Sequence, residues 1–423
     1  MKKLNKYLLG ASLAAALLIA GCSNNEKNQH EMNHNEMEHA EQEQPDSKSV
    51  AEKASKAPAE INENAGQNLI VEHTKNTMRL NTDDPLELSV MVSQTIWPAT
   101  HKESQPGSVI LVPEDNWQIA LAASDLIHHP NNGPVLFVGK NEFSEAVINE
   151  INRLNPVGNN EGVQIMAMGD IADSALQPLS NYKIEKINES DPAIFAQKVD
   201  EFYAKSAGDL PQSVIVVSQD QRAEAYSLPA VNWIAHMPEP VLYVTKDEVP
   251  KATKQALKER KNKANIYVLG PDSVISPEVE KQLKEYGNVT RISGDNPVSN
   301  AIAFAAFKDK DTGFGWGITD PGHGVSFIST ANLNLAIPAA PFSHMGKHAP
   351  MIWLEDGKPN EDVYKFLANI KPTFKDDPTT GPYNHGFIIG SQQSISFESQ
   401  GILDEKLEIV SQNGAGHSNH SGH

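Results

Sequence analysis

Apolar and polar positions recur along the chain in three similar blocks, spaced about 105 residues apart. Each block opens with Asp or Asn before proline, at Asp84, Asp191 and Asn296. Such a side chain caps free N–H groups and proline suits the first helical position, so a helix is predicted to start at each site. Three apolar runs typical of buried strands follow in every block. The runs are 109–112, 135–138 and 165–169, then 214–217, 241–244 and 266–270, then 326–329, 351–354 and 387–390.

Strands that alternate with helical stretches predict parallel sheets covered by helices, and therefore an α/β fold. The second helical stretch of each block is rich in small residues, at 117–127, 223–235 and 332–342. Small residues permit close approach, so we expect these three stretches to face one another around a pseudo-threefold axis. The predicted repeats are 76–184, 185–288 and 289–411.

The first 21 residues have the pattern of an export signal. Lys2, Lys3 and Lys6 precede the apolar stretch 7–20, which is too short for a stable membrane span. The sequence Ile-Ala-Gly-Cys that ends at Cys22 resembles a bacterial lipobox, which implies cleavage before Cys22 and attachment of fatty acyl chains such as palmitate. Removal of residues 1–21 changes the net charge from −19 to −22, because three lysines and no acids are lost. Such a charge argues against nucleic-acid binding, and it makes the lipid the predicted link to the membrane.

The segments that flank the repeats are polar. Residues 22–75 are predicted to be a disordered tether, and 412–423 a short tail. Both contain histidines, and the tether adds methionines, so they could capture Cu or Zn; the alternative is that these residues are incidental. The candidate ligands are His30, Met32, His34, Met37, His39, His417, His420 and His423.

The start of each block resembles the type-2 cell-wall-binding repeats of Gram-positive surface proteins. The best match is the segment 291–297, Arg-Ile-Ser-Gly-Asp-Asn-Pro, and 79–85 is similar. The resemblance implies three Rossmann-like or Toprim-like repeats packed as a pseudo-trimer that binds an anionic wall polymer without covalent linkage. All three blocks replace the Arg-Tyr-x-Thr core of that family by Asp or Asn followed by Pro. The residues carried over as polymer contacts are Arg79, Asp84, Arg291, Asp295 and Asn296.

Further histidines lie inside the blocks. His344 and His348 have the spacing of one helix face, although a loop is equally compatible with the following proline. His128, His129 and His236 occupy corresponding positions in the other blocks, which leaves two interpretations: a shared site, or surface histidines. The glycine-rich segment 313–324 is an insertion and a candidate binding surface.

The sequence contains no Gly-x-Ser-x-Gly or Walker pattern and no convincing pair of nucleophile and base. We therefore expect a non-catalytic, lipid-anchored protein on the extracytoplasmic face of the membrane, without a cofactor, that binds a wall polymer or a surface partner. The alternative is a lipoprotein that binds Cu or Zn through its His-rich ends.

Overall fold

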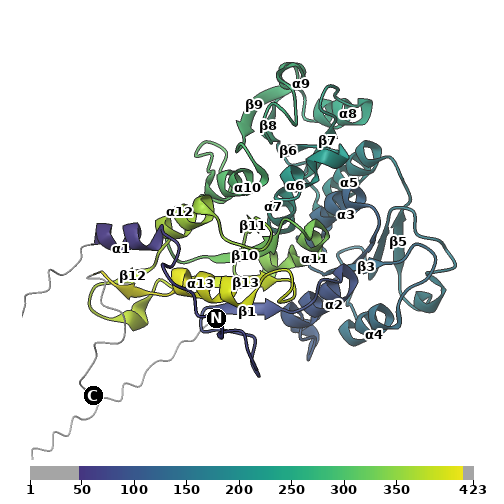
Figure 1. Ribbon diagram of the computed structural model, residues 1–423. Helices are drawn as coiled ribbons and strands as arrows, with labels where there is room; N and C mark the ends of the chain where they lie inside the picture. The colour runs from purple at the N-terminus through teal and green to yellow at the C-terminus, as the bar shows by residue number, and fades with distance from the viewer. Residues whose placement is uncertain (1–46, 413–423) are drawn as a thin grey trace, which may run out of the picture. The chain divides into compact units, whose positions relative to one another are not determined.

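Three four-stranded parallel sheets organise the protein. The computed structural model describes residues 47–412, and the sheets are seen in Figure 1. A short parallel pair, β12 (Thr373–Phe374) and β14 (Val410–Ser411), is separate from them. The first sheet has the strand order β3 (Val135–Val138), β2 (Val109–Pro113), β4 (Ile165–Met168) and β5 (Ile184–Ile187). The second has the order β7 (Val241–Val244), β6 (Ser213–Ser218), β8 (Ala264–Leu269) and β9 (Gly287–Ile292). The third has the order β11 (Met351–Leu354), β10 (Gly324–Ser329), β13 (His385–Ile389) and β1 (Thr77–Leu80).

The nine predicted strands are confirmed, and so are the three helix starts. Asp84, Asp191 and Asn296 each accept hydrogen bonds from N–H groups of the helix that begins at the next proline. The α-helices are α1 (Ser47–Ala54), α2 (Pro85–Ile96), α3 (Trp117–Ala123), α4 (Glu145–Leu154), α5 (Pro192–Ala207), α6 (Glu224–Ser227), α7 (Ala230–His236), α8 (Lys251–Glu259), α9 (Pro277–Leu283), α10 (Pro297–Ala306), α11 (Ala336–Ala339), α12 (Glu361–Asn369) and α13 (Phe397–Leu407). Shorter helical turns are η1 (Lys102–Ser104), η2 (Ser124–Ile127), η3 (Gln177–Leu179), η4 (Gln221–Ala223), η5 (Leu333–Leu335), η6 (Phe342–Gly346) and η7 (Pro378–Thr380).

The last strand of each sheet comes from the segment just before a proline-started helix. β5 completes the first sheet and leads into α5, and β9 completes the second sheet and leads into α10. The third sheet is completed by β1, which pairs with β13 from Thr77 opposite Gly386 to Leu80 opposite Ile389. The two ends of the described chain are therefore joined in one sheet.

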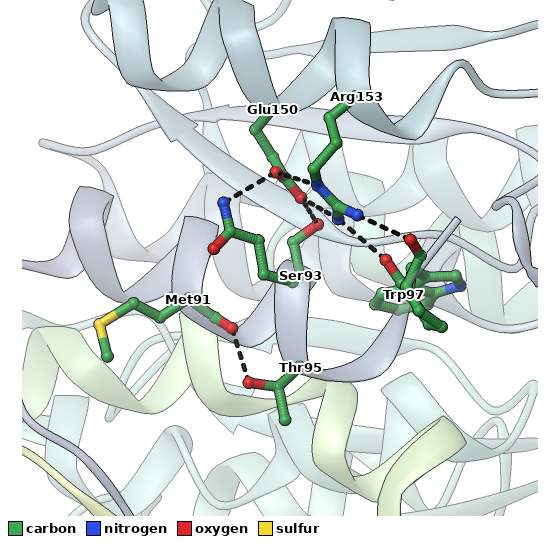
Figure 2. Close-up of polar contacts among 8 residues, drawn as sticks. Met91, Ser93, Thr95, Trp97, Glu150 and Arg153 are labelled. Atoms are coloured by element: carbon green, nitrogen blue, oxygen red, sulfur yellow. Dashed lines mark hydrogen bonds and ion pairs between the residues drawn. The ribbon is translucent and has the colours of Figure 1, made fainter. Parts of the chain in front are cut away.

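Most strands are buried on both faces, including the edge strands β3, β7 and β11. Every residue of β2, β3, β4, β6, β7, β10 and β11 is buried. A polar cluster joins α2 to α4 beside the first sheet (Figure 2). Buried Glu150 accepts hydrogen bonds from Ser93 and Arg153, and Arg153 also donates to the carbonyl of Trp97 at 2.8 Å. The helix pair is thus held by charged hydrogen bonds as well as by apolar contact.

A cation on the last strand of each sheet holds the loop that follows the neighbouring strand. The cations are Arg79 on β1, Lys186 on β5 and Arg291 on β9, and each donates to backbone carbonyls. The acceptors are Gly390 (2.8 Å) and Ile395 (2.8 Å) for Arg79, Ile171 (2.5 Å) for Lys186, and Gly270 (2.7 Å) and Ile275 (3.0 Å) for Arg291. The basic residue near the start of each block therefore has the same structural role in all three sheets, because it bonds to the loop after the neighbouring strand.

We expect Arg79→Ala to lower the free energy of unfolding by about 2 kcal/mol, because it leaves buried carbonyl oxygens without donors. Arg79→Lys should recover part of this loss, since Lys186 makes the corresponding contact in the first sheet. Urea denaturation of the three proteins measures the differences. Equal midpoints for Arg79→Ala and the parent protein would contradict the stabilising role assigned to the contacts of Arg79 with this loop.

One prediction is corrected by the structure. The tether predicted over 22–75 contains helix α1 within its described part, and α1 contacts α12. Val50 and Ala54 are buried, so their apolar side chains offset the ordering entropy that the polar composition suggested would prevail.

Candidate functional site

The three segments rich in small residues meet inside the protein. α11 contacts both α3 and α7, and α7 contacts η2 and η6. Their alanines are buried almost completely, among them Ala120, Ala123, Ala235 and Ala339. The contacts expected among these segments are therefore present.

Five histidines gather where these segments end. His128 and His129 follow η2, His236 is the last residue of α7, His344 lies in η6, and His348 follows it. Each segment leads into the outer strand of its sheet, β3, β7 or β11. Because a crossover helix runs antiparallel to its strands, its last turn lies at the edge of the sheet where the strands begin. The topology thus brings equivalent positions of the three segments together.

The histidine rings form two adjoining groups, which we call the histidine junction. The rings of His128, His129 and His344 have centroids 5.3 to 5.6 Å apart in every pairing. The rings of His236 and His348 lie 4.6 Å apart, with Nδ1 of His348 3.4 Å from Nε2 of His236. The five histidines are therefore neighbours in space, with His129 and His348 exposed and the other three half-buried.

Of the helix face and the loop that the sequence left open for His344 and His348, the structure excludes a shared face of a regular helix. His344 lies in η6, which is a π-helical turn that ends at Gly346. His348 lies beyond it with a φ of 50°, so the two residues do not share a regular helix.

The glycine-rich insertion packs against the junction. Trp316 stacks on His236 with ring centroids 5.2 Å apart and an interplanar angle of 11°. Phe314 is buried and stacks on Tyr267 of β8 at 3.7 Å. Segment 313–324 therefore fills space beside the second sheet, and it covers part of the histidine junction with aromatic surface.

Two acidic groups neighbour Tyr203, which contacts His128 and His129. Asp125 is buried, and neither carboxylate oxygen has a hydrogen-bond partner within residues 47–412. Burial, followed by the charges of Asp200 and Glu239, raises the pKa of Asp125 well above its usual range. Burial also raises the pKa of Glu239, whose carboxylate accepts from the indole N–H of Trp233 at 3.0 Å. The hydroxyl of Tyr203 donates to the carbonyl of His129 at 2.8 Å. Burial, followed by the charges of Asp125 and Glu239, raises the pKa of the same hydroxyl.

Three of the imidazoles, those of His128, His236 and His344, have lowered pKa values and are neutral at physiological pH. Burial, followed by neighbouring histidines, lowers the pKa of His344 to about 3. Burial and then His348 lower the pKa of His236 to about 4, and burial lowers that of His128. Protonation would place like charges side by side in a poorly solvated space. Protonation of these histidines at acidic pH is therefore expected to destabilise the packing of the junction.

The junction histidines have few polar side-chain neighbours among residues 47–412. Within the described residues, no group of three or more His, Cys, Asp or Glu side chains is placed to hold a metal ion. The polar contacts of the junction histidines are to Tyr203, Asn132, one another and backbone, so no serine or threonine is paired with an imidazole base there.

We expect the histidine junction to make stability sensitive to acid. The folded pKa values of His236 and His344 lie below the unfolded value near 6.5, so the unfolded chain binds more protons between these limits. The contribution of these two neutral histidines to the free energy of unfolding is fully present above pH 6.5, and it is lost as the pH drops toward 4. Since both rings are partly exposed, we expect the loss between pH 7 and 4.5 to exceed that of a His236→Gln/His344→Gln variant by only about 2 kcal/mol.

Thermal or urea unfolding at both pH values measures this difference. Asp125 and Glu239 have raised pKa values and act in the opposite direction, but they are present in both proteins and largely cancel in the comparison. Equal pH dependence in the parent and the variant would contradict the idea.

The residues predicted to contact a polymer are dispersed. Asp84 and Asn296 are exposed helix caps, and Asp295 is exposed beside Asn296. Arg79 is 3% exposed and Arg291 is half-buried, and both are engaged in their loops. Cys22 and the eight candidate metal ligands at the two ends lie outside the described residues, so their roles stay predictions. In the described part, no helix is long and apolar enough to cross a membrane.

Taken together, the three sheets define an α/β protein built from parallel four-stranded layers around a shared helical junction. The fold is similar to that of Cwp6 from Clostridium difficile, with a TM-score of 0.64, 16% identity, and coverage of 84% of this chain and 52% of that one. Cwp8 from the same organism gives a TM-score of 0.60 at 18% identity, with coverage of 79% and 52%. The chain thus spans about half the length of these solved structures.

One curated relative matches in sequence. A stretch of 133 residues is 31% identical to an amidase enhancer of Bacillus subtilis (strain 168), which corresponds to 30% of this chain and 18% of that protein. No protein-family model matches the chain.

Proposed function

We propose that this chain is a non-catalytic, lipid-anchored surface protein whose three repeats pack as a pseudo-trimer and bind a cell-wall polymer. The observation that carries this proposal is the strand order shared by the three sheets, in a fold similar to two cell-wall proteins. The pseudo-threefold arrangement is supported by the contacts among α3, α7 and α11. It is also supported by the equivalent loop contacts of Arg79, Lys186 and Arg291 in the three sheets. In this proposal Cys22 carries the lipid, and the protein lies on the extracytoplasmic face of the membrane.

Co-sedimentation with purified walls tests the proposal. The full chain carries Cys22→Ser, so that no lipid contributes, and is mixed with walls that either retain or lack their anionic polymer. We expect the protein to sediment with the complete walls, to be released by salt, and to stay in solution with the stripped walls. Failure to sediment with complete walls at low salt would refute the proposal.

A second candidate function is enhancement of an amidase. The stretch that is similar to an amidase enhancer favours it. Release of dye from labelled walls by a purified amidase, with and without the full chain, is the test. Unchanged release at saturating protein would exclude this role and leave wall binding untouched.

The metal-binding alternative rests on the His-rich ends. Calorimetric titration of the full chain with Cu²⁺ or Zn²⁺ tests it, with a chain that lacks both His-rich segments as the control. Equal binding by both proteins would remove the alternative.

A further inference from the structure

A polar pocket opens at the edge where the strands of the third sheet begin. Its volume is about 450 Å³. Basic or potentially basic side chains make up half of the residues that line it. They are Lys75, His323, Lys347, His348 and His385.

The topology explains why these side chains meet. In a parallel sheet all strands begin at one edge, so the residues before each strand become neighbours. Lys75 precedes β1, His323 precedes β10, and His385 is the first residue of β13. Lys347 and His348 precede β11. All four strands of the third sheet therefore contribute a basic side chain or a histidine to one pocket.

The other two sheets lack this arrangement. No histidine lies within three residues before any of their eight strands. The positions directly before these strands hold Ser108, Pro134, Gln164 and Lys183 in the first sheet, and Gln212, Pro240, Lys263 and Tyr286 in the second, so each sheet has one lysine there and no histidine. The pocket is therefore an individual feature of the third sheet rather than a property of the repeated fold, and it stands out in a chain of net charge −19.

Two groups that line the pocket have no hydrogen-bond or ion-pair partner among residues 47–412. Lys347 is exposed and has no ion-pair partner among residues 47–412. Nε2 of His385 is buried, and nothing in the described structure bonds to it. Burial and then the charge of Lys347 lower the pKa of His385, so its neutral ring can offer Nε2–H as a donor.

The remaining walls are fixed by internal hydrogen bonds. Asn384 donates to the carbonyl of Ile370 at 2.7 Å and accepts from the N–H groups of Gly322 and His323. Gly324 permits the close approach of the segment that carries Lys347, because a Cβ at position 324 would lie 2.8 Å from the Lys347 carbonyl oxygen. The pocket is thus preformed, which lowers the ordering cost of binding.

Two carboxylates lie at its margin. Glu408 pairs with Lys75 at 2.5 Å, and Asp320 lies 3.7 Å from Nε2 of His323. These acids offset part of the positive charge but leave Lys347 uncompensated. A ligand must therefore approach Lys347 and His385.

We propose that this pocket binds a phosphate group, and that in the cell this group belongs to a phosphodiester-linked polymer. A compact anion with several acceptor oxygens matches a lysine ammonium and a convergent imidazole donor. This inference deepens the proposed wall association, and rests on it for the source of the phosphate. It also supplies the cationic contact that the dispersed Asp84, Asp295 and Asn296 cannot provide.

Isothermal titration calorimetry on the full chain at low salt tests the pocket with three probes: inorganic phosphate, an oligomer of glycerol phosphate, and polyglutamate. We expect the glycerol phosphate oligomer to bind, and Lys347→Met to weaken its binding about tenfold. His385→Gln should weaken it as well. Lys263→Met, at an exposed position directly before β8, removes the same charge from the second sheet and should have no effect.

The two phosphate probes identify the source, since Lys347-dependent binding of inorganic phosphate alone would support the pocket but point to free phosphate. No binding of either phosphate probe, unchanged binding by Lys347→Met, or equal binding of polyglutamate would overturn the inference. Wall co-sedimentation of Lys347→Met separates the two proposals. Walls bound equally by parent and variant would refute the pocket and retain the wall association, whereas phosphate binding without wall binding would do the reverse.

Discussion

Asp200→Ala is expected to lower the free energy of unfolding by about 4 kcal/mol. Asp200 on α5 accepts two hydrogen bonds from the guanidinium of Arg260, both at 2.8 Å. The two side chains are 3% and 0% exposed. Removing the carboxylate leaves a buried charge without its partner, which costs far more than the pair contributes as a unit. Urea denaturation at pH 7 measures the change.

Two control variants separate this effect from simple loss of contact. Replacing both partners by apolar residues, Asp200→Leu with Arg260→Met, should recover most of the lost stability. Glu361→Ala removes an exposed ion pair with Lys365 on α12 and should produce no measurable change. A small effect of Asp200→Ala, equal to that of Glu361→Ala, would contradict the importance assigned to the buried pair.

Ala123→Trp is expected to destabilise the protein by about 3 kcal/mol, the upper part of the range for overpacked cores. Ala123 is fully buried at the end of α3, and α3 packs against α5, α11 and β7. An indole there must push apart elements that belong to different sheets. The thermal midpoint should therefore fall, with a broader transition if the sheets begin to unfold separately.

Ala207→Trp provides the matched control, because Ala207 is exposed in the last turn of α5. It should leave the midpoint nearly unchanged. An unchanged midpoint for Ala123→Trp as well would show that the helical junction tolerates separation, and it would weaken the proposed pseudo-threefold packing.

Local signals in the sequence were sufficient for the buried strands and the helix starts. Continuous apolar runs such as 135–138 and 241–244 reproduce β3 and β7 residue for residue. The last strands, β1, β5 and β9, were not predicted as strands. β5 and β9 are edge strands in which polar residues outnumber apolar ones or match them, so their pairing comes from the neighbouring strand rather than from their own composition.

The candidate site depends on contacts that no local pattern contains. The sequence indicated the histidines, but His128, His236 and His344 become neighbours only through the direction in which each crossover helix meets its sheet. The same holds for Lys347 and His385, which lie on different strands of one sheet edge. Arg79 illustrates a second limit of the sequence. Its motif could be recognised, but its buried acceptors lie 311 or more residues away along the chain and could not be predicted.

The pairing of β1 with β13 also sets an order for folding. A ribosome makes β1 before all other strands of its sheet, and the acceptor of Arg79 at Gly390 is made 311 residues later. Closing so long a loop adds little to the equilibrium cost, since each doubling of length costs only about 0.6 kcal/mol. It does delay completion, because distant pairings form slowly. The third sheet, which holds the phosphate pocket, can therefore close only after nearly the whole chain has been synthesised, and until then β1 must be kept from pairing with other strands.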